Sequence, residues 1–319
     1  MRRLALLCTL AVGGLAAAPP AQSAVTVGIS DQLAKTFVNP LYAPLKMKTA
    51  RYIAPWDVMD DAAQLKRFDD WMIGARLTKA RILVSFEHSR TAGRETVMPS
   101  IAEYTAALKK VKAVYGSQIK DISPWNEVNV CQKNGRTEGQ PVEICKNPKL
   151  ASDITKAGAR VFKGKSIVVL DFLDGNSPRA AIKYVKAFKK AYKPKSNAIW
   201  GLHNYSDTNR YDDKTQRTKE ILKEIGTKAQ VWLTETGGQV TFKKRSVAAG
   251  APFAAKALGC MFHIANKYKQ IKRIYVYSFN GTPENVGLLF DSGLVDAAGT
   301  TKRPGYAVVQ KRKARKCNK

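Results

Sequence analysis

The chain has 319 residues, of which 45% are hydrophobic and 25% are charged. This composition is that of a globular protein, and it excludes a disordered or a fibrous chain. The only apolar run long enough to matter to a membrane lies at the very start, which excludes a polytopic membrane protein. Charge is the exception, because 54 Lys and Arg residues against 25 Asp and Glu residues give a net charge of +29.

The first 24 residues have the three parts of a secretory signal peptide. Met1-Arg2-Arg3 is basic, Leu4 to Ala18 is apolar, and Ala21-Gln22-Ser23 has the small residues of a cleavage site. An anchoring helix is the alternative, but the apolar segment is short and Pro19-Pro20 follows it. We therefore expect a secreted, extracellular protein whose mature part is a single domain of residues 25–319.

Four cysteines remain in that mature part, namely Cys131, Cys145, Cys260 and Cys317. An even number in an oxidising compartment indicates two disulfides. The simplest pairing is Cys131 with Cys145 and Cys260 with Cys317, although four cysteines allow three pairings. Zinc binding is the weaker interpretation, because no Cys-x-x-Cys or neighbouring histidine completes a set of ligands.

Apolar runs typical of strands alternate with amphipathic helical patterns along the mature chain. Eight such runs occur, at Val25–Ile29, Ala50–Ala54, Ala80–Phe86, Ile119–Trp125, Ser166–Phe172, Ala198–His203, Gln230–Thr234 and Ile271–Phe279. Continuously apolar strands such as Ile82-Leu83-Val84 are typical of a parallel sheet covered by helices. Eight strand–helix units in nearly 300 residues predict a (β/α)8 TIM barrel rather than a doubly wound sheet.

The helices between these strands are predicted from apolar residues spaced three and four apart. Clear stripes run through residues 101–115, 182–192, 221–225 and 254–264. The first helix, near Leu41–Met47, and the last, after Pro304, have weaker patterns.

Two glutamates stand where predicted strands end. Glu127 closes Trp125-Asn126-Glu127 after strand four, and Glu235 closes Leu233-Thr234-Glu235 in strand seven. In a barrel such residues meet at one mouth, where a carboxylate is costly to desolvate unless it is paired or functional. Two facing carboxylates are the minimum needed to hydrolyse a glycosidic bond. The alternative is that either glutamate only pairs with a basic residue.

These residues resemble the clan A retaining glycoside hydrolases, such as family 5 and family 39 enzymes, and the likeness covers essentially the whole mature chain. The resemblance implies that Glu127 is the general acid/base and Glu235 the nucleophile. It also implies that Asn126 bonds the 2-hydroxyl of the sugar at the cleavage point. A carboxyl separation of about 5 Å and retention of anomeric configuration are expected with it.

Supporting residues of this clan have counterparts here. Arg51 lies in strand two, His88 follows strand three, and His203-x-Tyr205 follows strand six. The resemblance implies that Tyr205 hydrogen-bonds the nucleophile and that His203 and Arg51 orient the pair of glutamates. Glu87 is a rival acid, but a salt bridge behind His88 is the expected role.

The chain departs from the clan at strand eight, which the clan usually ends with a Trp under the scissile sugar. Here the sequence is Tyr277-Ser278-Phe279-Asn280, so Phe279 or Tyr277 is expected to supply the apolar platform. Trp56, just after strand two, either stacks on a sugar face or packs within the protein. The missing Trp motivates an alternative, a catalytically inactive barrel that binds carbohydrate or an anionic cell-surface polymer.

Basic residues gather in two stretches that contain no acid. Residues 179–195 carry seven Lys and Arg residues, and the tail from Lys302 onward carries eight. Such runs are either solvated faces or surfaces that attract an anionic polymer. The sequence has no fingerprint of specific nucleic-acid, nucleotide, metal or cofactor binding, and we expect a monomer without cofactors that acts on a carbohydrate.

Overall fold

The structure of the protein is a computed structural model that describes residues 25–131, 141–175, 178–210, 217–242, 246–283 and 290–317. The predicted signal peptide, residues 1–24, lies outside the described residues.

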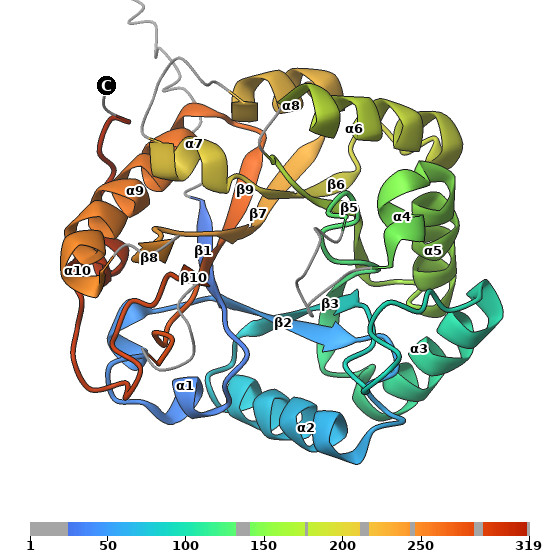
Figure 1. Ribbon diagram of the computed structural model, residues 1–319, viewed down its shortest axis with the longest axis horizontal. Helices are drawn as coiled ribbons and strands as arrows, with labels where there is room; N and C mark the ends of the chain where they lie inside the picture. Colours follow the sequence, from blue (N-terminus) through green and yellow to red (C-terminus); the bar gives the residue numbers. More distant parts are fainter. Residues whose placement is uncertain are drawn as a thin grey trace, which may run out of the picture.

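Eight parallel strands close into a barrel inside a ring of helices (Figure 1). The last strand of the barrel pairs with the first along five residues, which closes the ring. This confirms the (β/α)8 architecture and the single domain predicted from the sequence. In barrel order the strands are β1 (Thr26–Ser30), β2 (Thr49–Pro55), β3 (Arg81–Glu87), β4 (Ile119–Ser123), β5 (Ser166–Leu173), β6 (Ile199–His203), β7 (Gln230–Thr236) and β9 (Ile271–Tyr277).

The outer ring around the barrel consists of helices (Figure 1). They are α2 (Ala62–Leu77), α3 (Ile101–Tyr115), α5 (Pro148–Val161), α6 (Pro178–Tyr192), α8 (Arg217–Ile225), α9 (Val247–Lys267) and α10 (Pro304–Gln310). In α3 the predicted stripe is buried, and Ser100 and Glu103 form a capping box that starts the helix. The apolar helix α9 is long enough to cross a bilayer, but it packs against α7, α10 and β9, as a barrel helix does.

The shorter elements are α1 (Lys35–Val38), the 3-10 turn η1 (Ala43–Leu45), α4 (Val142–Lys146) and α7 (Tyr205–Arg210). The helix expected near Leu41–Met47 is thus replaced by the four-residue α1 and one 3-10 turn. Pro44 lies in that turn, and Lys46 after it has a φ of 51°, a left-handed conformation that ends the turn.

The amino ends of the strands are closed by a buried ion-pair network. Asp121 on β4 is fully buried and accepts hydrogen bonds from Arg81 and Arg273. The guanidinium of Arg273 lies 3.8 Å from the centre of the Trp232 ring. This network lies at the end of the barrel opposite the mouth that the carboxyl ends of the strands form.

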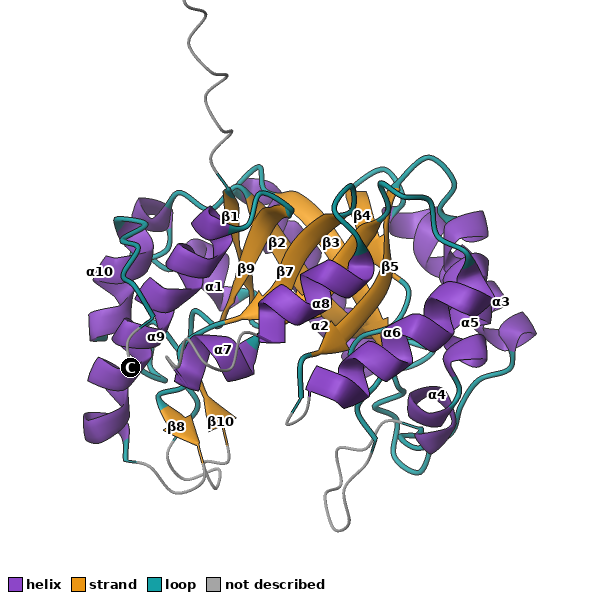
Figure 2. Cartoon of the chain, turned by 90° about the horizontal axis from the view of Figure 1, so that it is seen from above, coloured by secondary structure: helices purple, strands orange, loops and turns teal. Residues whose placement is uncertain are grey.

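The carboxyl ends of the strands carry the longer connections, among them a small antiparallel sheet of β8 (Thr241–Phe242) and β10 (Phe290–Asp291). Figure 2 shows these two strands beyond the end of the barrel.

Both predicted disulfides are present. Cys131 pairs with Cys145 in the connection after β4, and Cys260 of α9 pairs with Cys317 of the tail. This pairing is the one expected from the sequence. The two bonds thus fix one connection at the mouth and the carboxyl-terminal end of the described chain.

Candidate active site

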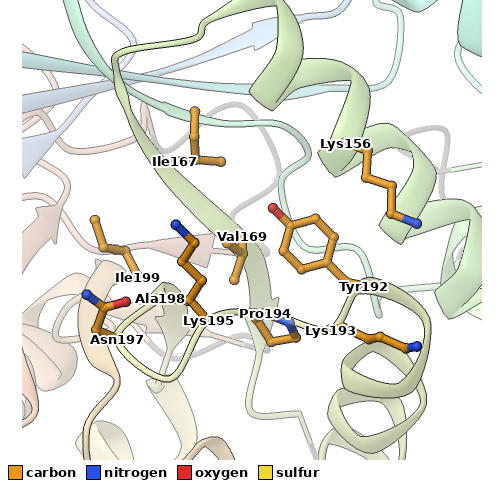
Figure 3. A pocket seen from close by; sticks show the side chains of 10 residues that line it. All are labelled: Lys156, Ile167, Val169, Tyr192, Lys193, Pro194, Lys195, Asn197, Ala198 and Ile199. Atoms are coloured by element: carbon orange, nitrogen blue, oxygen red, sulfur yellow. The ribbon is translucent and has the colours of Figure 1, made fainter.

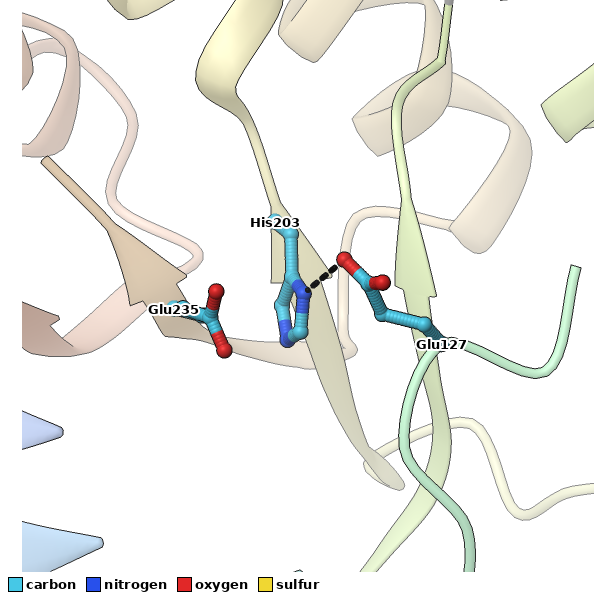
Figure 4. Close-up of side chains that lie close together, drawn as sticks. All are labelled: Glu127, His203 and Glu235. Carbon is cyan, nitrogen blue, oxygen red and sulfur yellow. Dashed lines mark hydrogen bonds and ion pairs between the residues drawn. The ribbon is translucent and has the colours of Figure 1, made fainter. Parts of the chain in front are cut away.

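Glu127 and Glu235 face each other across the mouth, with His203 between them (Figure 4). One carboxylate oxygen of each glutamate and one ring nitrogen of His203 all lie within 4.8 Å of one another. The exposed fraction of the side chain is 23% for Glu127 and 12% for Glu235, whereas His203 is fully buried. Both carboxylates therefore reach the solvent-facing mouth, whereas the histidine between them is buried.

The backbone turns sharply at Glu127, which has a left-handed φ of 46°. This conformation is uncommon outside glycine and persists only where the surroundings impose it. The neighbouring strands do so, because Asn126 N–H donates to the Phe86 carbonyl at 2.6 Å and Val128 N–H donates to the Asp171 carbonyl at 3.1 Å. Glu127 is thus held between β3 and β5.

Arg51 organises the floor of the site. Its side chain is fully buried, and its guanidinium has five N–H groups to satisfy. The acceptors are Ser85 Oγ at 2.9 Å, Ser30 Oγ at 3.1 Å, Glu235 Oε2 at 2.8 Å, Asn126 Oδ1 at 2.6 Å and Asp171 Oδ2 at 3.2 Å. One cation therefore fixes residues from several strands at once.

Asp171 on β5 is the residue of this network that the sequence reading missed. It is fully buried and accepts from Ser123 Oγ at 3.0 Å and from the Thr234 hydroxyl. Its Oδ1 also lies 3.0 Å from Nε2 of His203. Burial raises the pKa of Asp171, but His203 and Arg51 outweigh burial and hold that pKa well below its usual range. The sequence feature that could have indicated Asp171 is its position as an acid inside the apolar run from Ile167 to Phe172.

His203 is held as an imidazolium. Burial alone lowers its pKa, but the charges of Asp171 and Glu235 reverse that effect and raise the pKa to about 10. Its Nδ1 lies 2.9 Å from Glu127 Oε1, so the charged ring donates to that carboxyl group. Two carboxylates and an imidazole are also ligands that metals accept. In this structure both ring nitrogens of His203 already lie within 3.0 Å of a carboxyl oxygen, that of Glu127 or of Asp171.

Glu235 is hydrogen-bonded at both oxygens. Arg51 occupies Oε2, and the Tyr205 hydroxyl donates to Oε1 at 3.1 Å, which is the contact expected from the sequence. Burial, followed by the charge of Glu235, raises the pKa of Tyr205 well above its usual value, so the phenol remains a donor.

Phe279 was expected to supply an apolar platform for the sugar, and the structure does not support this role. That residue is fully buried and packs edge-on against Tyr42, so it offers no platform to a sugar. The ring of Tyr277 is only partly buried, and it lies 5.9 Å from the ring of Phe290. Phe290 on β10 also packs against Tyr205 at 5.5 Å. The sequence did not indicate Phe290, because this residue lies well beyond the end of β9 and not at a strand end of the barrel.

The remaining expected site residues lie on the β2–β3 side of the mouth. Trp56 is almost fully buried, and the Arg94 guanidinium lies 5.3 Å from its ring centre. Of the two roles expected for Trp56, this arrangement fits packing within the protein. His88 is partly exposed, with Nδ1 3.9 Å from Glu87. Glu87 also binds Arg90 at 2.6 Å, so it forms ion pairs beside His88, as the sequence predicted.

No protein-family model matches the chain, and no curated protein matches its sequence. Solved structures do match its fold. GH5_18 from Streptomyces cattleya, in complex with GlcNAc, superposes with a TM-score of 0.65 and 10% identity over 90% of this chain and 79% of that one. A family 39 glycoside hydrolase from Bacteroides cellulosilyticus has a TM-score of 0.61 and 13% identity over 91% of this chain and 64% of its own.

Native xylanase 10B from Thermotoga maritima is similar to the same degree, with a TM-score of 0.63 and 11% identity over 91% of this chain and 95% of that one. At such identities the likeness concerns the fold. The chain therefore has the closed (β/α)8 barrel that is also found in glycoside hydrolases of families 5, 39 and 10.

Proposed function

We propose that this protein is a retaining glycoside hydrolase that acts on a poly- or oligosaccharide. The observation that carries the proposal is the approach of the Glu127 and Glu235 carboxylates to within 4.8 Å at the mouth of the barrel. Retaining enzymes hold their two carboxyl groups about 5–5.5 Å apart, whereas inverting enzymes leave about 6.5–9.5 Å for a water molecule. The fold neighbours, which include a family 39 glycoside hydrolase and a xylanase, support the same reaction class.

The contacts of the two glutamates support their roles. Arg51 and Tyr205 each hold one oxygen of Glu235, which orients this carboxyl group as the nucleophile. Glu127 reaches further into the mouth, with 23% of its side chain exposed, and is the acid/base of the proposal.

The first step transfers the Glu127 proton to the glycosidic oxygen while a Glu235 oxygen attacks the anomeric carbon. The bond to the leaving group breaks and a glycosyl ester of Glu235 forms. His203 donates to Oε1 of Glu127, which leaves Oε2 to carry the transferred proton. In the second step the Glu127 carboxylate takes a proton from water, whose oxygen attacks the anomeric carbon and releases Glu235.

Asn126, Tyr277 and Phe290 are proposed to contact the sugar. Arg51 occupies Asn126 Oδ1, so the amide is held in one orientation for the 2-hydroxyl. The rings of Tyr277 and Phe290 take the place expected of a strand-end Trp, since flat aromatic side chains suit the apolar faces of sugars.

Aryl glycosides of several sugars, followed by NMR of the released anomer, test the proposal. We expect retention of configuration. Glu235→Gln should lower kcat by at least about 10³-fold, because removal of a nucleophile abolishes the covalent step. Glu127→Ala should lower kcat by about 10²–10⁴-fold on poor leaving groups, and added azide should restore turnover on good ones as the glycosyl azide.

Glu87→Gln is the matched control, because Glu87 is a strand-end glutamate beside Asn126 that is already paired with Arg90. Its effect should be much smaller than that of either candidate. Inversion of configuration, or loss of turnover in Glu87→Gln but not in Glu127→Ala, would overturn the assignment. Sugar binding without release of any aglycone would instead indicate the inactive carbohydrate-binding barrel.

A further inference from the structure

A groove on the face opposite the candidate active site lies where β5 and β6 begin. Its volume is about 450 Å³, and it is open to solvent between these strands and the helices α5 and α6. Ile167 and Val169 of β5 and Ile199 of β6 form its apolar floor (Figure 3). Because active sites of such barrels lie at the carboxyl ends of the strands, this groove at the amino ends is a separate feature.

The rim of the groove is basic. Lys156 of α5 and Lys193 and Lys195 of the connection after α6 line it, and all three are exposed. No acidic residue is among the described residues that line the groove. Residues 156–198 contain eleven Lys and Arg residues and two acids, Asp171 and Asp174, and both of these acids are fully buried.

The positive charges at the rim are poorly neutralised. Lys156 is 3.7 Å from Asp153, but that carboxylate also binds Lys149 at 2.8 Å. Lys193 and Lys195 have no ion pair with any residue that the structure describes. By contrast, Lys186 and Lys189 of the neighbouring helix α6 share Glu224 of α8. Lys193 and Lys195, which line the groove, are therefore among the uncompensated charges of this region.

The shape of the rim is fixed by the chain itself. Lys193 adopts a left-handed φ of 55° and its N–H caps α6 through the Lys189 carbonyl, so the helix ends there. Pro194 follows and restricts the backbone further. In Figure 3 the ammonium group of Lys195 and the hydroxyl of Tyr192 both point inward over the apolar floor. The groove thus presents cations, a hydroxyl and an apolar surface together.

We propose that this groove binds a segment of a carboxylate-bearing polysaccharide. Sugar rings have apolar faces that suit the floor, their hydroxyls suit Tyr192 and Asn197, and their carboxylates suit the lysines. The choice of a glycan rests on the proposed function. Nucleic acid is disfavoured because Tyr192, the one aromatic residue among the described residues that line the groove, already stacks on Phe188 at 5.2 Å, whereas single strands need free aromatic faces.

Such a site tethers the protein to an acidic polymer and leaves the catalytic mouth free. The groove and the mouth lie at opposite ends of the strands, so one polymer chain bound in the groove does not obstruct the glutamates. Because the attraction is electrostatic, it acts at longer range at low salt and weakens as salt is added.

Affinity electrophoresis of the full mature chain in gels containing polygalacturonate tests the proposal. Measurements use the Glu235→Gln background, so that binding is separated from turnover and the failure of one proposal leaves the other standing. We expect the Lys156→Gln, Lys193→Gln, Lys195→Gln triple variant to bind at least about tenfold more weakly. Fully methyl-esterified polygalacturonate, which lacks the charge, should bind the unchanged groove more weakly by a similar factor.

A second triple variant, Lys35→Gln, Lys66→Gln, Lys256→Gln, is the matched control. It removes the same charge from exposed positions on α1, α2 and α9, across the barrel from the groove. It should change the affinity less than about twofold. Equal weakening by both triple variants would show that only net charge matters and would overturn the proposal. Unchanged binding in the groove variant, or tighter binding of single-stranded DNA than of polygalacturonate, would also overturn it.

Discussion

Arg51, Asp171 and His203 place two cations and one anion in a space from which water is excluded. Burying any one of these charges alone would be unfavourable, because an isolated buried charge costs several kcal/mol. Together with Glu235 they satisfy one another, and the same contacts position Glu127 and Glu235 at the mouth. Asp171 is a positioning residue, since it contacts Arg51 and His203 and reaches neither mouth-facing carboxyl oxygen.

Replacing Asp171 tests this at the residue scale. Asp171→Asn should destabilise the protein by about 3–5 kcal/mol, because removal of one member of a buried ion pair leaves its partners uncompensated. Guanidinium denaturation at neutral pH measures the change. Asp153→Asn, an acid half-exposed on α5, should cost less than about 1 kcal/mol. Similar stability in the two variants would contradict the role given to Asp171.

The protonation of His203 gives a prediction of its own. Its pKa is raised to about 10, above the ordinary value of 6.5 that it has in the unfolded chain. Its contribution to stability is therefore complete below about pH 6.5 and is lost as the pH rises toward 10. NMR titration of the imidazole signals, assigned with His88→Gln and His263→Gln, measures the pKa directly. A His203 signal that titrates near pH 6.5 would disprove the imidazolium.

At the scale of elements, β5 explains how Asp171 enters the barrel. Val168 belongs to an interior cluster with Leu83, Trp232 and Tyr275, so a regular strand would place residue 171 on the opposite face. The β5–β6 register shifts between Val168 and Asp171. This bulge turns both side chains inward. An apolar pattern read by alternation alone does not reveal such a shift.

The two disulfides close loops of different length. The bond at Cys131 and Cys145 spans 14 residues, whereas that at Cys260 and Cys317 spans 57. On the loop-entropy model their removal should cost about 3 and about 4 kcal/mol respectively.

Denaturation of the paired Cys→Ala variants compares these costs. We expect the variant without the tail disulfide to be the less stable of the two, since the longer loop gains more entropy on unfolding. Each pair is the other's control. A larger loss from the shorter loop would mean that contacts around the connection after β4 matter more than chain entropy.

At the scale of the whole molecule, the dominant feature is positive charge. Removal of the predicted signal peptide takes Arg2 and Arg3 away, which leaves 52 basic and 25 acidic residues and a net charge of +27. Most of these side chains lie on the helices and the tail, where they repel one another in the compact state.

Added salt should therefore stabilise the protein. Raising NaCl from about 0.01 M to about 0.15 M shortens the screening length from about 30 Å to about 8 Å. We expect Tm to rise by about 2–4 °C, as measured by calorimetry without polymer present. Choline chloride should give the same rise, because screening depends on ionic strength. A falling Tm would mean that the ion pairs contribute more than the net repulsion.

The sequence by itself determined the order of the eight strands, the barrel, the disulfide pairing favoured for four cysteines, and the placement of Glu127 and Glu235 at one mouth. These follow from local patterns, since apolar runs mark strands and polar residues after them mark strand ends. The first helix was misplaced because a four-residue helix leaves almost no periodic signal.

Only the tertiary structure decided which side chains share the base of the site. Arg51 gathers partners from along the whole chain, Asp171 turns inward through a bulge, and Phe279 lies in the core while Tyr277 and Phe290 form the wall. The basic groove likewise combines α5, α6 and the starts of two strands. Each of these depends on the register between strands and on the face that a side chain takes, and neither property is encoded in a local stretch of residues.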